Sequence, residues 1–173
     1  MQIETALSND RIIIRDYVAT DLSFVTEMWC DKENGQYLSD PTKENIDAVY
    51  QNALEAMENN ADGYYLVIET KDTRQPIGSC CAFPDEQKEV YDIGYCIHKA
   101  HWRQGYGTDA VALLIKWICA CGGKEITAEV AKDNLASNLL LKKFGFAVKT
   151  QSQFKKYKTN LCYDSYIYSL VLR

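Results

Sequence analysis

The sequence predicts a mixed α+β fold, in which a twisted, mostly antiparallel sheet of about seven strands carries helices on both faces. Three strand-like segments joined by polar connections indicate an antiparallel meander. A strand–helix–strand unit between residues 90 and 130 requires one parallel pair. The chain has 173 residues, the size of one domain, so we expect residues 1–173 to form a single unit.

The first half of the chain is expected to form one strand, two helices and three more strands. Residues 11–17 include three consecutive isoleucines, which favour a strand. Thr20 is expected to cap a first helix, and Asp40 followed by Pro41 to start a second one that ends near residue 59. The strands that follow are predicted at 64–69, 77–83 and 90–97.

The second half is predicted to alternate helices and strands. A glycine loop leads into an amphipathic helix that continues to Cys121. The later elements are a strand at 125–130, a short helix at 137–144, and strands at 147–153 and 165–172. The complete order is β-α-α-β-β-β-α-β-α-β-β.

Composition excludes several classes of protein. Hydrophobic residues make up 47% of the chain, but no apolar run reaches the ~18 residues of a membrane span. The first residues lack the features of a signal peptide, so a cytoplasmic protein without a membrane partner is expected. A net charge of −5 argues against a nucleic-acid partner. The seven cysteines and two histidines do not have zinc-site spacing, which predicts reduced, mostly buried thiols and no metal.

The segment HWRQGYGTDA at 101–110 predicts a site for an anion. Gly105 and Gly107 precede a helix whose first backbone N–H groups lack partners, and such groups bind phosphates. Neither a P-loop nor the three-glycine dinucleotide motif is present. The local pattern alone fits an ordinary loop-to-helix turn equally well. If the two parallel strands separate beside this turn, the gap between them would form a ligand site.

Several short motifs resemble those of a known enzyme family. They are DIGY at 92–95, WRQGYGTDA at 102–110, NLAS at 134–137, KFGF at 143–146 and DSYIYS at 164–169. In this order they resemble the GNAT superfamily of acetyl-CoA-dependent N-acetyltransferases, most of all its ribosomal-protein (RimJ/RimL-like) branch. The likeness extends from about residue 11 to the C-terminal end of the chain. One departure is Asp92, where that branch has glutamate.

The resemblance implies a GNAT-type three-layer fold and acetyl-CoA (coenzyme A) as co-substrate. The acceptor implied is a small-molecule amine or a protein N-terminal amine, and the enzyme would be a monomer or homodimer. The residues that it places at the cofactor are Ile97, Arg103, Gln104, Gly105, Tyr106, Gly107, Thr108, Asn134, Asn138 and Lys143.

The same resemblance suggests residues for chemistry and for acceptor binding. Asp92 is the candidate general base, and Ser137 is the candidate hydroxyl beside the departing sulfur. Candidates for contact with the acceptor are Trp29, Tyr37, Asp92 and Tyr166. The resemblance places one wall of the acceptor site in the 20–60 region, which also holds Asp31, Glu33 and Asp40; these acids suit an amine, or they form an ordinary polar surface.

Each of these residues also has a simpler interpretation. Asn134 and Ser137 could serve as capping groups of a helix, Lys143 as a solvated lysine in a last turn, and Asp92 as a structural carboxylate. At the level of the whole chain, the alternatives are a module that binds acyl-CoA without catalysis and a site for a different nucleotide.

Overall fold

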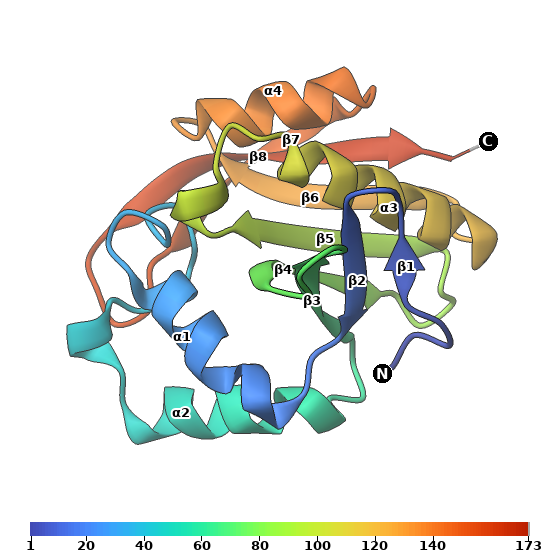
Figure 1. Cartoon of the computed structure of the whole chain (residues 1–173). Helices are drawn as coiled ribbons and strands as arrows, with labels where there is room; N and C mark the ends of the chain where they lie inside the picture. The colour runs from blue at the N-terminus through green and yellow to red at the C-terminus, as the bar shows by residue number, and fades with distance from the viewer. Residues whose placement is uncertain (173) are drawn as a thin grey trace.

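The computed structural model describes residues 1–172 and contains one eight-stranded sheet with four α-helices (Figure 1). The strands are β1 (Leu7–Ser8), β2 (Ile12–Asp16), β3 (Tyr64–Thr70), β4 (Pro76–Pro84), β5 (Val90–Ile97), β6 (Glu125–Ala131), β7 (Ala147–Lys155) and β8 (Cys162–Val171). The helices are α1 (Leu22–Cys30), α2 (Ala48–Glu55), α3 (Tyr106–Ala120) and α4 (Leu135–Lys143). The predicted mixed fold is confirmed, and the additional strand is the two-residue β1.

The strands lie in the order β1-β2-β3-β4-β5-β6-β8-β7. All neighbouring pairs are antiparallel except β5 and β6, which are parallel because α3 connects them. The meander β3–β4–β5 and the parallel pair were both predicted from the sequence.

Helices cover both faces of the sheet and define two cores. Side chains alternate along β3, so Leu66 and Ile68 lie in a larger core while Val67 lies in a smaller one. The larger core includes residues of α3 and α4, and the smaller one includes residues of α1 and α2. Figure 1 shows these helix pairs on opposite sides of the sheet.

The parallel strands separate after a short paired stretch. Only residues 90–92 of β5 pair with residues 125–127 of β6. Beyond this point β5 keeps β4 as its partner up to Ile97, whereas β6 pairs with β8. The separation that the sequence suggested is therefore present, and it lies beside the glycine loop that starts α3.

Two helix starts differ from the prediction. The second helix begins at Ala48 rather than at Asp40, and its N-cap is Asp47, whose carboxylate accepts a hydrogen bond from the Tyr50 N–H at 2.9 Å. The segment after Asp40 forms a short 3₁₀ turn instead. Thr20 does not cap α1, because it lies inside a 3₁₀ turn that leads directly into that helix.

The thiols are more exposed than predicted. Cys119, Cys121 and Cys162 are exposed, because the end of α3 and the start of β8 face solvent. No helix among residues 1–172 is long and apolar enough to cross a membrane. Within the same residues, no cluster of three or more His, Cys, Asp or Glu side chains is placed to hold a metal ion.

Candidate active site

The turn before α3 has the geometry expected of an anion site. Gly105 is the N-cap of α3 and has φ = 85°, a left-handed conformation that favours glycine. Because glycine has no capping side chain, the first N–H groups of α3 receive no side-chain partner. These donors and the helix dipole together favour a bound anion.

Arg11, at the edge of β2, fastens this turn. Its guanidinium donates to the Gln104 carbonyl at 2.6 Å and to Asp109 at 2.8 Å. It also lies 4.6 Å from the centre of the Tyr106 ring. The pairing compensates the negative charge of Asp109, which would otherwise oppose a phosphate in the first turn of α3. No local pattern in the sequence indicated this role of Arg11.

A cavity of about 630 Å³ extends from the glycine turn to the gap between β5 and β6. Of the predicted cofactor residues, it is lined by Ile97, Arg103, Gly105, Tyr106, Gly107, Thr108 and Asn134. Ser137, the candidate hydroxyl, also lines it. Asn134 has two roles, because its side chain also accepts the Ser137 N–H at 3.2 Å as the N-cap of α4.

Three predicted cofactor residues are not among the residues that line this cavity. The Gln104 side chain donates to the Ala100 carbonyl at 3.4 Å. Asn138 is buried and accepts the Tyr168 hydroxyl at 2.7 Å, while its NH₂ group donates to backbone carbonyls that hold the start of α4. Lys143 is exposed in the last turn of α4.

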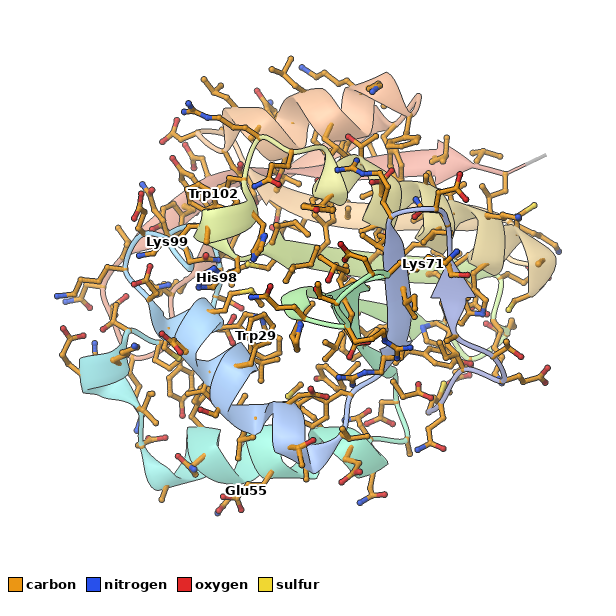
Figure 2. The ribbon with its side chains drawn as sticks, in the orientation of Figure 1. Trp29, Glu55, Lys71, His98, Lys99 and Trp102 are labelled. Atoms are coloured by element: carbon orange, nitrogen blue, oxygen red, sulfur yellow. The ribbon has the colours of Figure 1, made fainter. Side chains whose placement is uncertain are left out.

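The carbonyl of Ile97 already has donors in the protein. It accepts the Trp102 indole N–H at 2.7 Å and the Asn34 amide at 3.3 Å. Figure 2 shows Trp102 on the loop that leaves β5, beside His98 and Lys99. A cofactor arm that pairs with this carbonyl would have to share it with these two groups or displace one.

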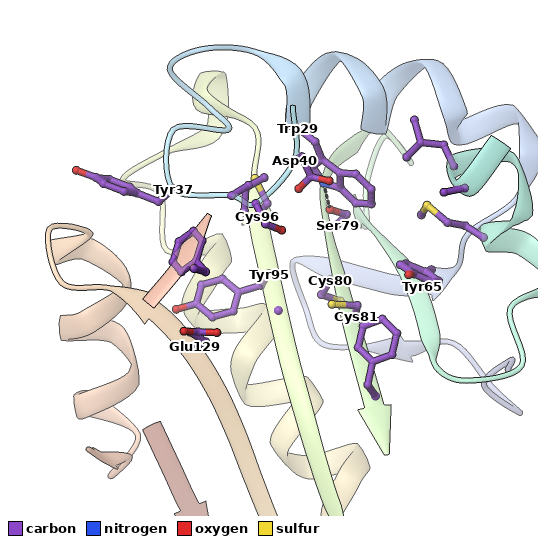
Figure 3. Close-up of a pocket in the computed structure, with 18 of the residues that line it drawn as sticks. Trp29, Tyr37, Asp40, Tyr65, Ser79, Cys80, Cys81, Tyr95, Cys96 and Glu129 are labelled. Carbon is purple, nitrogen blue, oxygen red and sulfur yellow. Dashed lines mark hydrogen bonds between the residues drawn. The ribbon is translucent and has the colours of Figure 1, made fainter. Parts of the chain in front are cut away.

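A second cavity, of about 440 Å³, lies beside α1 and α2 (Figure 3). Trp29 and Tyr37, which the sequence suggested for the acceptor, both line it. Four residues line both cavities: Tyr37, Leu38, Tyr95 and Cys96. The two spaces therefore meet at the part of β5 that has no partner on the β6 side.

Asp40 is a carboxylate that lines the second cavity. Its Oδ1 accepts the Tyr50 hydroxyl at 2.7 Å. Burial raises the pKa of Asp40, and this outweighs the hydrogen bond from Tyr50 and the charge of Lys156, which both lower it. From its position before proline, Asp40 was expected to start a helix, and the resemblance placed it in the region that forms a wall of the acceptor site. The structure agrees with the second expectation and not with the first.

Asp92 and Tyr166 do not line either cavity. Asp92 is exposed, and one of its oxygens accepts the Thr127 hydroxyl at 2.8 Å. The surrounding protein nevertheless raises the pKa of Asp92, and the charge of Glu129 adds to this effect. Asp92 lies two residues before Gly94 on the same strand, and therefore on the same face of the sheet. Gly94 does line the second cavity, which we call the acceptor-side cavity.

Tyr95 lies where the two cavities meet. Its hydroxyl is buried and lies near the Ser137 side chain, which lowers its pKa, but the two do not form a hydrogen bond of normal geometry, and no other partner is present within the described protein. Burial dominates and raises the pKa of Tyr95 to about 12, so the hydroxyl keeps its proton and remains a donor. An unpaired buried donor at this point is suited to a ligand atom. The sequence showed Tyr95 only as part of a motif.

The segment between α1 and α2 forms a wall of both cavities and is held by the β7–β8 connection. The buried ammonium of Lys156 donates to the carbonyls of Gly35 and Leu38 at 2.8 and 3.0 Å. The Tyr157 N–H and the Tyr163 hydroxyl add bonds to this segment at 2.7 and 2.6 Å. These long-range contacts fix the wall, and no local pattern revealed them.

Comparison with known proteins identifies the class. Residues 11–147 match the family model of the acetyltransferase (GNAT) domain, and the chain belongs to that family. Over 169 residues it is 29% identical to the uncharacterized N-acetyltransferase YoaA of Bacillus subtilis, with 95% of this chain and 96% of YoaA covered. The predicted family is therefore confirmed.

Solved structures share the fold at low sequence identity. Spermidine N-acetyltransferase from Vibrio cholerae, in complex with CoA and spermine, has a TM-score of 0.79 and 14% identity, with 94% of this chain and 96% of that chain covered. The Salmonella typhimurium acetyltransferase that modifies the N-terminal serine of ribosomal protein L7/L12 has a TM-score of 0.77 and 14% identity, with coverage of 98% and 100%.

Proposed function

We propose that this protein is an N-acetyltransferase, acting as a single domain, that transfers the acetyl group of acetyl-CoA to a primary amine. The observation that carries the proposal is the meeting of two cavities at the unpaired part of β5. One cavity starts at the helix N-terminus, which suits a pyrophosphate, and the other contains a carboxylate, which suits an ammonium group. The family and the relative named as an N-acetyltransferase support it.

In this proposal the backbone from Arg103 to Thr108 binds the pyrophosphate and Ile97 lies along the pantetheine arm. The acyl group would then reach Tyr95 and Cys96, where the amine arrives from the other side. The Ser137 hydroxyl, on the cofactor side, is the donor for the departing sulfur. The resemblance suggests Asp92 as the base, whereas Asp40 is the carboxylate that lines the acceptor-side cavity, and the variants described below decide between the two.

The first test uses the substitution Gly107→Glu. A Cβ at Gly107 would lie 3.2 Å from Leu140 and 3.8 Å from Ile97, so the new side chain starts in the cofactor cavity. It would add bulk and negative charge where phosphates are expected. We expect acetyl-CoA affinity, measured by calorimetry, to fall at least about 100-fold, which corresponds to about 2.7 kcal/mol.

The matched control is Gly122→Glu at the other end of α3. It adds the same charge at a glycine that lines neither cavity and where a Cβ would have no other atom within 4 Å. Because Gly122 has φ = 83°, the side chain strains the backbone and lowers stability, but the acetyl-CoA affinity of the folded protein should be unchanged. Equal affinity in wild type and Gly107→Glu would show that the cofactor binds elsewhere.

A second candidate function is a module that binds acyl-CoA without catalysis, and the position of Asp92 supports it. Asp92 replaces the longer glutamate of the ribosomal-protein branch and lies outside both cavities. Thiol release during incubation with acetyl-CoA and a broad amine panel separates the two. Binding without any amine-dependent thiol release would favour the module.

A further inference from the structure

One part of the acceptor-side cavity is apolar. It lies between α2 and the strands β3 and β4, and the side chains there are Ala53, Leu54, Met57, Tyr65 and Phe83. Tyr65 and Phe83 pack edge to face, with ring centres 5.4 Å apart. Among the described residues that line the cavity, none is lysine or arginine. No cation of the lining therefore repels an ammonium group, and this apolar part of the cavity suits an uncharged group.

Asp40 lies at the edge of this apolar part. Figure 3 shows it beside Trp29 and above the strand that carries Cys96. Trp29 is fixed in place because its indole N–H donates to the Ser79 hydroxyl at 2.9 Å. Among residues 1–172 no ion pair with Asp40 is present, since the nearby ammonium of Lys156 donates to the Gly35 and Leu38 carbonyls instead. A half-buried carboxylate that lines a cavity and has one neutral side-chain donor is suited to a cationic ligand.

We propose that this cavity binds a primary amine carried on an apolar aliphatic or aromatic body, and that Asp40 pairs with its ammonium group and accepts its proton. The inference rests on the proposed function and names the substrate class for it. The body would occupy the space between α2 and β4, and the nitrogen would lie between Asp40 and Cys96, next to the junction with the cofactor cavity.

The proton balance of the reaction is complete with these groups. The ammonium transfers one proton to Asp40, and the neutral nitrogen attacks the thioester carbonyl carbon. The N–C bond forms and the C–S bond breaks, with the electron pair leaving on sulfur. The second proton from nitrogen passes to the thiolate, with the Ser137 hydroxyl as donor or relay, and Asp40 releases its proton to solvent.

The surroundings of Asp40 favour this role. The titratable groups around it are Cys30 on α1, Tyr50 on α2, Tyr65 on β3, Cys81 on β4, Cys96 on β5 and Lys156 after β7. Burial raises the pKa of each of these thiols and tyrosines, so they stay neutral at pH 7. Lys156 is the one cation in this set. The raised pKa of Asp40 brings it closer to that of an amine than an ordinary carboxyl would be.

The cavity is less suited to a polyamine. A second ammonium placed between α2 and β4 would be buried without a carboxylate. The other carboxylate that lines the cavity is Glu129, which accepts the Ser165 hydroxyl at 2.5 Å. Figure 3 shows Glu129 beside Tyr95, away from Asp40. The V. cholerae enzyme that shares this fold is named for spermidine. We therefore expect the two proteins to differ in acceptor although they share the fold.

The test compares amines at equal concentration with saturating acetyl-CoA. The panel contains phenethylamine, tryptamine, hexylamine, spermidine, an aminoglycoside and a peptide with a free N-terminus. We expect kcat/KM for the aromatic and alkyl monoamines to exceed that for the polyamine, aminoglycoside and peptide at least about 10-fold. A preference for any of the last three overturns the inference and leaves the proposed function intact. No acetylation of any amine, with acetyl-CoA still bound, overturns both.

The substitution Asp40→Asn tests the assigned residue, because asparagine keeps an oxygen to accept the Tyr50 hydroxyl. We expect kcat/KM for the best monoamine to fall about 100-fold or more and the acidic limb of its pH profile to disappear, with acetyl-CoA affinity unchanged. Asp62→Asn, an exposed residue in the α2–β3 connection, is the acid-to-amide control and should leave kcat/KM unchanged.

Two comparison variants decide between carboxylates. Glu129→Gln and Asp92→Asn should each retain the acidic limb of the pH profile. If either one removes it while Asp40→Asn does not, Asp40 is not the proton acceptor. A readout that needs no turnover is the binding of phenethylamine to the protein in the presence of coenzyme A, monitored by tryptophan fluorescence. Trp29→Phe shows whether Trp29 is the source of the fluorescence change. Binding unchanged by Asp40→Asn would contradict the ammonium contact.

Discussion

Two enclosed aspartates, Asp21 and Asp40, are held in opposite ways. Asp21 is 5% exposed and receives both terminal nitrogens of Arg15, at 2.7 and 2.9 Å, together with the Val18 N–H at 3.0 Å. Asp40 receives one phenol and no cation. Burial tends to raise the pKa of both, but the contacts of Asp21 bring its pKa below the usual value, whereas that of Asp40 stays raised.

The difference shows how one fold separates structural from reactive carboxylates. Around Arg15, a single guanidinium joins β2, the start of α1 and Glu69 on β3, so the acids there stabilise the fold as ions. Near the cavity, the ammonium of Lys156 is bound to the backbone carbonyls of Gly35 and Leu38. Asp40 is therefore left without a charged partner, and an amine can supply one.

The largest expected effect is on stability, at the ion-paired cluster of Arg15, Asp21 and Glu69. Arg15→Met leaves Asp21 and Glu69, each 6% exposed at the side chain, without their shared cation. We expect the free energy of unfolding at pH 7 to fall by about 3 kcal/mol. Because the pKa of Asp21 is lowered in the folded state, this stabilisation is present above the unfolded pKa of about 4 and is lost as pH falls through the folded pKa. Urea unfolding at pH 7 and pH 3 measures both.

Arg74→Met is the matched control for that prediction. Arg74 pairs with the same Glu69 at 2.7 Å, but its side chain is 58% exposed. Solvent screening limits such a pair to about 0–1 kcal/mol. Equal losses of unfolding free energy in Arg15→Met and Arg74→Met would mean that burial does not strengthen the ion pairs of this cluster. The contrast between the ion-paired Asp21 and the unpaired Asp40 would then have no energetic basis.

Lys156 is the nearby cation that does not form an ion pair with Asp40, and its removal should have the next largest effect on stability. Lys156→Met leaves the carbonyls of Gly35 and Leu38 without their donor, so we expect a loss of about 2 kcal/mol in the free energy of unfolding. Lys155→Met, one residue earlier and exposed, should change stability by less than about 0.5 kcal/mol. Because Lys156 lowers the pKa of Asp40, the acidic limb of the pH profile should also move to higher pH.

Local pattern predicted most of the fold. Periodicity and glycine punctuation located the meander, the crossover through α3 and the separating strands, since these depend on residues close in sequence. The start of α2 was misplaced because proline after Asp40 fits a helix start, whereas the chain forms a 3₁₀ turn there and α2 is capped by Asp47. The Asp47 carboxylate also accepts hydrogen bonds from Tyr157 and Lys158, more than a hundred residues away, which no local pattern could indicate. β1 was missed because two residues carry no periodicity.

The site was predictable only in part, for the same reason. The glycine turn is local, and most of its expected residues line the cofactor cavity. The acceptor side is assembled from α1, α2, β3, β4, β5 and the segment between the first two helices. Spacing therefore gave no role to Tyr95, and the resemblance placed Asp40 only within a region expected at the acceptor, without a role of its own. Asp92 was favoured by its motif, yet its side chain is directed to Thr127. Resemblance locates a position on a strand, whereas the cavity depends on what packs against that strand.

The smallest expected effect is a pH-dependent change in the stability of Asp40→Asn, and it tests the contrast between Asp21 and Asp40 most directly. Because the pKa of Asp40 is raised by burial, the folded state is favoured by its protonated form, and this stability is lost as pH rises through the folded pKa. Asp40→Asn should therefore be more stable than wild type at pH 8, by about 1 kcal/mol, and equal to it near pH 4. Asp47→Asn should show the opposite sign, because the hydrogen bond from Lys158 lowers the pKa of Asp47. A loss of stability at pH 8 in Asp40→Asn would place Asp40 with Asp21, as a carboxylate kept for the fold and not for chemistry.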